Sequence, residues 1–248
     1  MHTRLRPRES LRCADDLPTR DSPPLPARFY VTGTDTGVGK SVASAALLHA
    51  LRARGGRVVG MKPVASGCEV VDGGWRNEDA LLLQAASDPR PAYADVNPYA
   101  LRAPVAPELA LRDEGIELSL APILQAYERL AAQADRVVVE GVGGWMAPLS
   151  ATLDQLDLVR ALDLPVVLVV GMRLGCINHA RLTVRALAED GVRLAGWIAN
   201  EVEPAMPRLD ENVAILRMRL PAPYWGRLPH APTPDPARLA CHLQLQAA

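Results

Sequence analysis

The sequence predicts an α/β fold, in which a parallel sheet is covered by helices on both faces. Two observations lead to this prediction. From Arg28 onward, short apolar runs alternate with longer segments of helical character, which is the order of parallel β–α units. The apolar runs are rich in valine, as expected for strands whose two faces are both buried. The 248 residues are 49% hydrophobic, and we expect them to form a single domain.

Five short apolar runs are predicted to be the strands of this sheet. Each is a short apolar stretch of five to seven residues, and most are rich in valine. Their ranges are 28–32, 57–62, 136–140, 166–171 and 194–200.

Six longer segments between and after these strands are predicted to be helices. The first is expected to end before the glycine pair at 55 and 56, and the fifth before Gly191, because glycine readily terminates helices. The predicted ranges are 40–54, 78–86, 120–134, 153–162, 177–190 and 207–218.

The first 27 residues differ in composition from the rest of the chain. They are rich in arginine and proline, and they lack the apolar stretch of a secretory signal. We expect residues 1–27 to be a flexible extension and residues 28–248 to form the folded domain.

Charge and residue usage argue against several classes of partner. The formal net charge is −1, which gives no electrostatic reason to expect nucleic acid or an anionic membrane as partner. The longest apolar run, 165–171, has the length of a strand and is far below the ~20 residues of a membrane span. The four cysteines form no C-x-x-C pair, which argues against a zinc site and fits a reducing cytoplasm.

The segment from Phe29 to Ser41 has the pattern of a phosphate-binding loop. An apolar strand leads into a glycine-rich turn, and Gly39-Lys40-Ser41 then opens a helix. In such a loop the backbone N–H groups face an anion, the lysine reaches the outer phosphates and the serine hydroxyl binds Mg²⁺. The leading glycine is Gly33, one residue earlier than in the usual G-x-x-x-x-G-K-[ST] spacing. The sequence therefore predicts a P-loop NTPase-type fold with a nucleoside triphosphate as ligand.

Polar residues follow each of the five predicted strands. Ligands of open parallel sheets bind beyond the carboxyl ends of the strands, so we expect these residues to converge on one site. They are residues 34–40, 62–66, 140–144, 172–178 and Asn200.

Three charged residues among these and in the next helix are candidates for the chemistry. Lys62 ends the second strand, where a cation stabilises a moving phosphoryl group, although a lysine at a strand end is often only a surface residue. Glu140 ends the third strand before glycines that let the backbone approach a ligand, and it is a candidate Mg²⁺ ligand or salt-bridge partner. Asp79 is a second candidate metal ligand, but an acidic residue that stabilises a helix N-terminus has the same position.

Residues 174–179 after the fourth strand form a second predicted anion site. The sequence Leu-Gly-Cys-Ile-Asn-His opens a helix, whose free N–H groups suit a carboxylate. Asn178 is alternatively only a helix cap, and His179 has a structural role in our interpretation. Asn200 offers an amide that matches the edge of adenine, and a turn-forming asparagine is the alternative.

Four segments together resemble the dethiobiotin synthetase family. These are residues 31–41, residues 62–67 (Lys-Pro-Val-Ala-Ser-Gly), residues 139–145 (Val-Glu-Gly-Val-Gly-Gly-Trp) and residues 174–179. Residues 97–99 and 195–200 are similar as well, and the resemblance runs in order from about Arg28 to Pro229. The displaced leading glycine, Gly33, is that family's own form of the phosphate loop.

The resemblance implies a homodimeric, Mg²⁺-dependent ligase of biotin biosynthesis that uses ATP as co-substrate. In that family 7,8-diaminononanoate takes up CO₂ as a carbamate, ATP phosphorylates the carbamate, and the second amine closes the ureido ring. ADP, phosphate and dethiobiotin are released.

The resemblance also implies roles for individual residues. Lys62 and Lys40 would be catalytic, and Ser41, Asp79 and Glu140 would hold the metal. The substrate would contact Thr36 and Ser66, and its carboxylate would bind the helix start of the neighbouring subunit at Gly175, Cys176, Ile177 and Asn178. The nucleotide would be held by Gly37, Val38, Gly39, Lys40, Ser41, Val42, Glu140, Gly141, Val142 and Gly143, and its adenine by Asn200, Glu201, Pro229 and His230.

Three features depart from the family pattern. Ser41 stands where threonine is common, Gly37 replaces an acidic residue of some members, and the N-terminal extension has no family counterpart. A regulatory or partitioning P-loop ATPase is the rival function. That class commonly has an extra lysine early in the phosphate loop. Asp35 occupies the corresponding position here, which counts against this rival. An inactive nucleotide-binding module is a second rival, and the presence of Lys40, Ser41, Lys62 and Glu140 argues against it.

Overall fold

A computed structural model describes residues 25–246 of the chain. Its centre is one six-stranded sheet in the order β10-β9-β8-β1-β7-β2, in which every neighbouring pair is parallel. The strand bounds are β1 Arg28–Gly33, β2 Val58–Met61, β7 Arg136–Gly144, β8 Val166–Met172, β9 Leu194–Glu201 and β10 Tyr224–Leu228. The predicted parallel sheet is therefore confirmed, and β1, which leads into the phosphate loop, lies in its interior.

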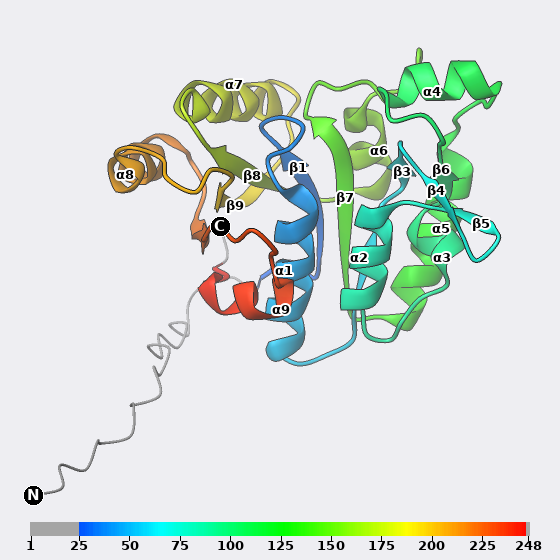
Figure 1. The fold of residues 1–248 in the computed structure, drawn as a ribbon, viewed down its shortest axis with the longest axis horizontal. Coiled ribbons are helices and arrows are strands. Elements are labelled where there is room, and N and C mark those ends of the chain that lie inside the picture. Colours follow the sequence, from blue (N-terminus) through cyan, green and yellow to red (C-terminus); the bar gives the residue numbers. More distant parts are fainter. Residues whose placement is uncertain (1–24, 247–248) are drawn as a thin grey trace, which may run out of the picture.

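Helices cover both faces of the sheet, as the sequence predicts (Figure 1). On one face, α1 (Lys40–Ala53), α2 (Glu78–Ala86) and α9 (Pro236–Leu239) bury the side of β1 that carries Phe29 and Val31. On the other face lie α5 (Leu120–Gln133), α6 (Gln155–Leu162), α7 (Cys176–Glu189) and α8 (Leu209–Arg219). Alternate residues of one strand thus enter two separate cores, because successive side chains of a strand point to opposite faces.

Several short elements were not predicted. They are the two-stranded sheet of β3 (Val64–Ala65) and β6 (Tyr99–Ala100), the hairpin of β4 (Glu69–Val71) and β5 (Gly74–Arg76), α3 (Tyr93–Val96), α4 (Pro107–Glu114), α9, the 3₁₀ turn Ala240–His242, and the edge strand β10. Most of them are too short to show a hydrophobic period. Strand β10 contains Gly226 and Arg227, which interrupt its apolar pattern.

The predicted helix at 153–162 begins two residues later than expected. Asp154 and Asp157 form a reciprocal capping box, in which each carboxylate accepts a hydrogen bond from the backbone N–H of the other residue. The helix therefore starts at Gln155. Residues 1–24 of the predicted extension lie outside the described part of the chain. Leu25, near its end, packs against the core.

Candidate functional site

A cavity of about 690 Å³ opens at the carboxyl edge of the sheet. Its wall combines the phosphate loop, residues that follow β2, the start of α2, the segment before α4, and the end of β7 with the loop after it. Eleven of the predicted site residues line it: Thr36, Gly37, Gly39, Lys40, Ser41, Val42, Lys62, Ser66, Asp79, Val142 and Gly143. Three of the five predicted strand ends, those at 34–40, 62–66 and 140–144, therefore contribute to this cavity, whereas residues 172–178 and Asn200 do not line it.

The phosphate loop is held in shape by close packing behind it. Gly39 has a φ of 78°, and a side chain there would collide with the amide of Asn200. The Asn200 amide nitrogen donates a hydrogen bond to the Val38 carbonyl at 3.0 Å. Val38 itself is buried, and its side chain lies close to Gly33 and Gly171. The displaced glycine thus provides room for Val38, because any side chain at residue 33 would meet the Val38 methyl group.

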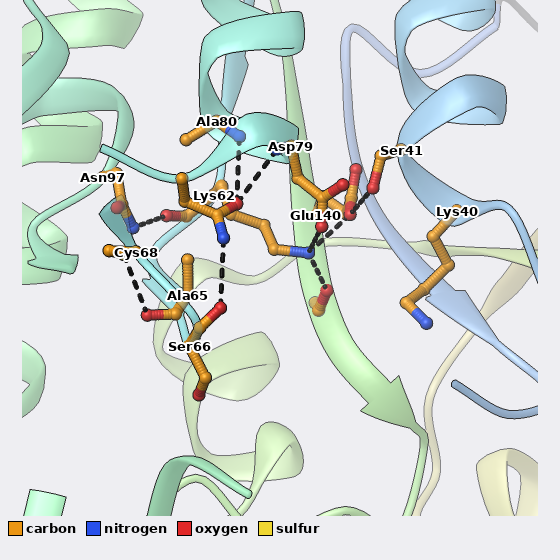
Figure 2. Close-up of polar contacts among 12 residues, drawn as sticks. Lys40, Ser41, Lys62, Ala65, Ser66, Cys68, Asp79, Ala80, Asn97 and Glu140 are labelled. Carbon is orange, nitrogen blue, oxygen red and sulfur yellow. Dashed lines mark hydrogen bonds and ion pairs between the residues drawn. The ribbon is translucent and has the colours of Figure 1, made fainter. Parts of the chain in front are cut away.

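Lys62, which lines the cavity, forms a buried ion pair with Glu140, which lies behind the cavity wall (Figure 2). The Lys62 ammonium lies 2.5 Å from Oε1 of Glu140, 3.3 Å from Oδ2 of Asp79 and 3.1 Å from the carbonyl oxygen of Gly141. Lys62 is 3% exposed and Glu140 is fully buried. The three N–H groups of this lysine thus have three acceptors.

Two further groups join this cluster from the phosphate loop. The Ser41 hydroxyl donates a hydrogen bond to the same Glu140 oxygen at 2.8 Å. The Lys40 ammonium donates to the carbonyl oxygen of Asp35 at 3.0 Å, so in this structure it lies over its own loop. Ser41, Asp79 and Glu140, the three predicted metal ligands, therefore lie together.

The surroundings shift the pKa of each lysine in the cluster. Burial would lower the pKa of Lys62, but the charges of Glu140 and Asp79 and the hydrogen bonds to them outweigh burial and raise it. Lys62 is therefore a cation at neutral pH and not a base. Burial, together with the charge of Lys62, lowers the pKa of Lys40 to about 8. Burial would raise the pKa of Asp79, but the charge of Lys62 and hydrogen bonds outweigh burial and lower it.

Two oxygens at this site are buried without a hydrogen-bond partner among the described residues. They are Oε2 of Glu140 and the hydroxyl of Ser66. Buried polar atoms are normally paired, so both atoms indicate a place for a ligand group.

The four residues predicted to hold adenine lie together but outside the cavity wall. Asn200 and Glu201 end β9, and Pro229 and His230 follow β10, its neighbour in the sheet. The Glu201 carboxylate contacts Arg227 at 3.1 Å and accepts a hydrogen bond from the His230 backbone at 3.4 Å. Asn200 lies within β9 and so does not form a turn, and its bond to Val38 gives it a different structural role. Its role toward adenine stays a prediction.

The predicted carboxylate site also lies outside the cavity wall of this chain. Gly175 caps α7 with a φ of 96°, Cys176 is buried, and Asn178 is exposed in the first turn. Leu174 beside them is 95% exposed. The loop before α7 nevertheless contacts the phosphate loop, because Arg173 lies 2.6 Å from the carboxylate of Asp35.

Sequence reasoning missed part of the cavity wall. Asn77 caps α2 and donates to the Ser66 carbonyl, and residues 104–107 form another part of the wall. A cap signal before Glu78 was present in the sequence. Residues 104–107 carry no comparable motif, since only the fold brings them to this edge.

The fold and this cluster define a P-loop nucleotide-binding protein of the α/β class. A strand, a glycine-rich turn and a helix start form the loop, and Glu140 contacts its serine from the middle of the neighbouring strand β7, which continues to Gly144 and not, as predicted, only to residue 140. Within the described residues no helix has the length and apolar character needed to cross a membrane.

Comparison with known proteins narrows this class. The family model described as AAA domain matches residues 27–238. An ATP-dependent dethiobiotin synthetase of Xanthomonas oryzae pv. oryzae (strain PXO99A) is 69% identical over 220 residues, which cover 89% of this chain and 98% of that protein. The enzyme of the same name from Xylella fastidiosa (strain 9a5c) is 64% identical over 219 residues, which cover 88% and 97%. The chain belongs to the dethiobiotin synthetase family.

More distant similarity extends to solved structures of other proteins. A chain of the MinC:MinD cell division protein complex of Aquifex aeolicus is 16% identical, with a TM-score of 0.49 and coverage of 84% of this chain and 83% of that one.

Proposed function

We propose that this protein is a cyclo-ligase that converts 7,8-diaminononanoate, CO₂ and ATP into dethiobiotin, ADP and phosphate. Family membership at 64–69% identity supports the reaction. The observation that carries it in the structure is the position of Lys62. Its buried ammonium has an acceptor for each N–H group, and Lys62 lines the same cavity as the phosphate loop, where a phosphoryl group would be transferred.

The reaction proceeds in three steps. One amine of the diamine adds to CO₂ and loses a proton, giving a carbamate. A carbamate oxygen attacks the γ-phosphorus of ATP, and the bond to ADP breaks. The second amine then attacks the carbonyl carbon, the bond to phosphate breaks, and the ureido ring closes with loss of a proton.

The residues of the cavity suit these steps. The backbone of residues 33–41 would hold the triphosphate at the start of α1. Lys40 and Lys62 would offset the negative charge of the carbamate and the γ-phosphate, which otherwise repel each other. The Thr36 and Ser66 hydroxyls would orient the substrate, and the unpaired Ser66 hydroxyl supports this role. Asn200, Glu201, Pro229 and His230 would contact adenine.

Mg²⁺ fits the oxygen atoms present in the cluster. Within residues 25–246 no group of three or more His, Cys, Asp and Glu side chains forms a metal cage. Mg²⁺ in ATP-dependent enzymes usually needs only one or two carboxylates beside the phosphates and water. Glu140 and Asp79, with the Ser41 hydroxyl, provide this set, and the Glu140 oxygen Oε2 has no other partner. When bound, Mg²⁺ would neutralise triphosphate charge and polarise the phosphoryl oxygens.

The substrate carboxylate would bind at the start of α7 in a second copy of the chain. Residues 175–178 lie outside the cavity wall of their own chain, which is consistent with a site shared across a homodimer. The exposed Leu174 beside them is suited to burial at such an interface. We expect the enzyme to act in the cytoplasm.

The direct test is incubation with the diamine, bicarbonate and MgATP, followed by mass detection of dethiobiotin. Product is expected only when all three are present, with one phosphate released for each ring closed. Phosphate release without diamine, and without ureido product, would instead indicate a switch ATPase.

A further inference from the structure

A fully buried glutamine lies under the loop that follows β7. Gln155 is the first residue of α6 and has no exposed surface. Its amide nitrogen lies within hydrogen-bond reach of three backbone carbonyls: Gly144, in the shortest contact, Trp145 at 3.2 Å and Ala147 at 3.3 Å. Of the two ends of the amide, only the nitrogen can donate to carbonyl oxygens, so these neighbours fix the orientation of the side chain.

The other end of this side chain is held from the centre of the sheet. The hydroxyl of Tyr30, a fully buried residue of β1, donates to Oε1 of Gln155 at 2.9 Å. A side chain at Gly141 would collide with both this oxygen and the Tyr30 hydroxyl, so the backbone of β7 rests directly on the pair. Tyr30, Gln155 and Gly141 thus form one packed unit.

This unit contacts the reaction site from two directions. The Gly141 carbonyl accepts the hydrogen bond from Lys62. One wall of the cavity is formed by Val142 and Gly143, at the end of β7, and by Ala147 and Pro148, in the loop that Gln155 holds. We propose that Gln155, oriented by Tyr30, is a positioning residue that holds the loop after β7 and the acceptor of Lys62 in place for phosphoryl transfer.

The inference rests on the proposed function, and it is tested with Gln155→Leu. This variant keeps an apolar volume but removes the amide that holds three carbonyls. We expect kcat to fall about 10- to 100-fold, because small displacements of reacting groups cost this much. The Kd for ATP should change less than about threefold, because Val38 and Asn200 hold the phosphate loop independently.

Gln84→Leu is the matched control. Gln84 is also buried, and its amide nitrogen donates to the carbonyl of Pro91 at 2.9 Å, but it does not line the cavity. Its replacement should change kcat less than twofold. Tyr30→Phe removes only the bond to Oε1, so its effect on kcat should be smaller than that of Gln155→Leu.

Hydrogen–deuterium exchange gives a readout independent of activity. Amides of residues 143–149 should exchange faster in the Gln155→Leu variant than in wild type or in the Gln84→Leu control. Should Gln155→Leu not fold, Gln155→Glu replaces the donor with an acceptor of the same shape, and the same results are expected.

Three results would overturn the inference: unchanged exchange at residues 143–149, unchanged kcat despite faster exchange, or an equal loss of kcat in the Gln84 control. Failure of the proposed function shows separately, as absence of dethiobiotin with the wild-type enzyme. The exchange comparison then still shows whether Gln155 holds the loop.

Discussion

The ammonium of Lys62 and the carboxylate of Glu140 are 2.5 Å apart, and both side chains are buried. Burying a charge destabilises a fold unless an opposite charge compensates it. Each of these two residues therefore offsets the desolvation cost of the other in the folded protein. The pair therefore has two roles that experiments can separate: stability of the fold and charge in the reaction.

Lys62→Met should reduce turnover much more than it reduces ATP affinity. The substitution removes the cation but keeps most of the side-chain volume, and loss of a charge that stabilises a transition state lowers kcat by about 100-fold or more. The Kd for ATP, measured by titration calorimetry, should change only a few-fold. An unchanged kcat would remove Lys62 from the mechanism.

The same variant should lose stability through the partner left behind. An unpaired buried carboxylate at Glu140 costs about 3–5 kcal/mol, which urea unfolding can measure. The double variant Lys62→Met with Glu140→Gln should recover most of this loss without recovering activity. If the double variant is no more stable than the single one, the pair is not coupled as we describe.

Asn178→Ala should weaken diamine binding and leave ATP binding intact. Its position in the first turn of α7 places it at the predicted carboxylate site. The KM for the diamine should rise about tenfold, the size expected for one lost hydrogen bond to a charged group. Asn212→Ala, in the first turn of α8, is the control and should leave the KM unchanged. Equal loss of diamine and ATP binding would contradict this site.

Gly39→Ala should disrupt nucleotide binding through a local collision. Alanine at this positive φ is strained by about 1–2 kcal/mol, and its methyl group would also meet the Asn200 amide. Gly73→Ala is the matched control, since Gly73 has a similar φ of 76° but open space around it. Both variants should lose stability, and only Gly39→Ala should lose ATP affinity in calorimetric titration.

Asp135 provides a pH-dependent contribution to stability away from the site. Hydrogen bonds from the Arg57 side chain and backbone lower its pKa from 3.8 to about 2. Since the unfolded chain binds the proton more readily, the contribution is present above about pH 4 and is lost as the pH falls toward 2. Wild type should therefore exceed Asp135→Asn in unfolding free energy at pH 7, and the difference should shrink below about pH 4.

Denaturant titrations between pH 3 and 7 measure this difference. Asp113→Asn is the control, because the Asp113 carboxylate makes only a surface contact with Arg112 at 3.5 Å. A difference between wild type and Asp135→Asn that does not depend on pH would exclude the Arg57 pair as its cause.

The phosphate loop and its partners Lys62 and Glu140 were predictable from sequence because each has a local signal. Lys40 and Ser41 lie in a motif of fixed spacing, and Lys62 and Glu140 directly follow apolar runs. Asp79 was ambiguous from spacing alone, since acidic residues are common in the first turn of a helix. Its contact with Lys62 exists only because the fold brings α2 beside the end of β2.

Other residues had no sequence signal for their role. Gln155 follows a capping aspartate at a helix start, a position where polar residues are usually exposed, and only the tertiary structure shows that it is buried. The segment at 104–107 and strand β10 are similar cases, because their positions depend on long-range packing and not on a local pattern.

The strand order places the two halves of the site on backbones with different supports. Strand β1, which leads into the phosphate loop, has strands on both sides, whereas β2, which precedes Lys62, is paired with a strand of the main sheet on one side only. The outer edge of β2 is held instead by the segment from Ser87 to Val96: Val58 exchanges backbone hydrogen bonds with Asp88, and the Lys62 N–H donates to the Val96 carbonyl at 2.7 Å. A change in that segment would therefore displace Lys62 while the phosphate loop kept its shape.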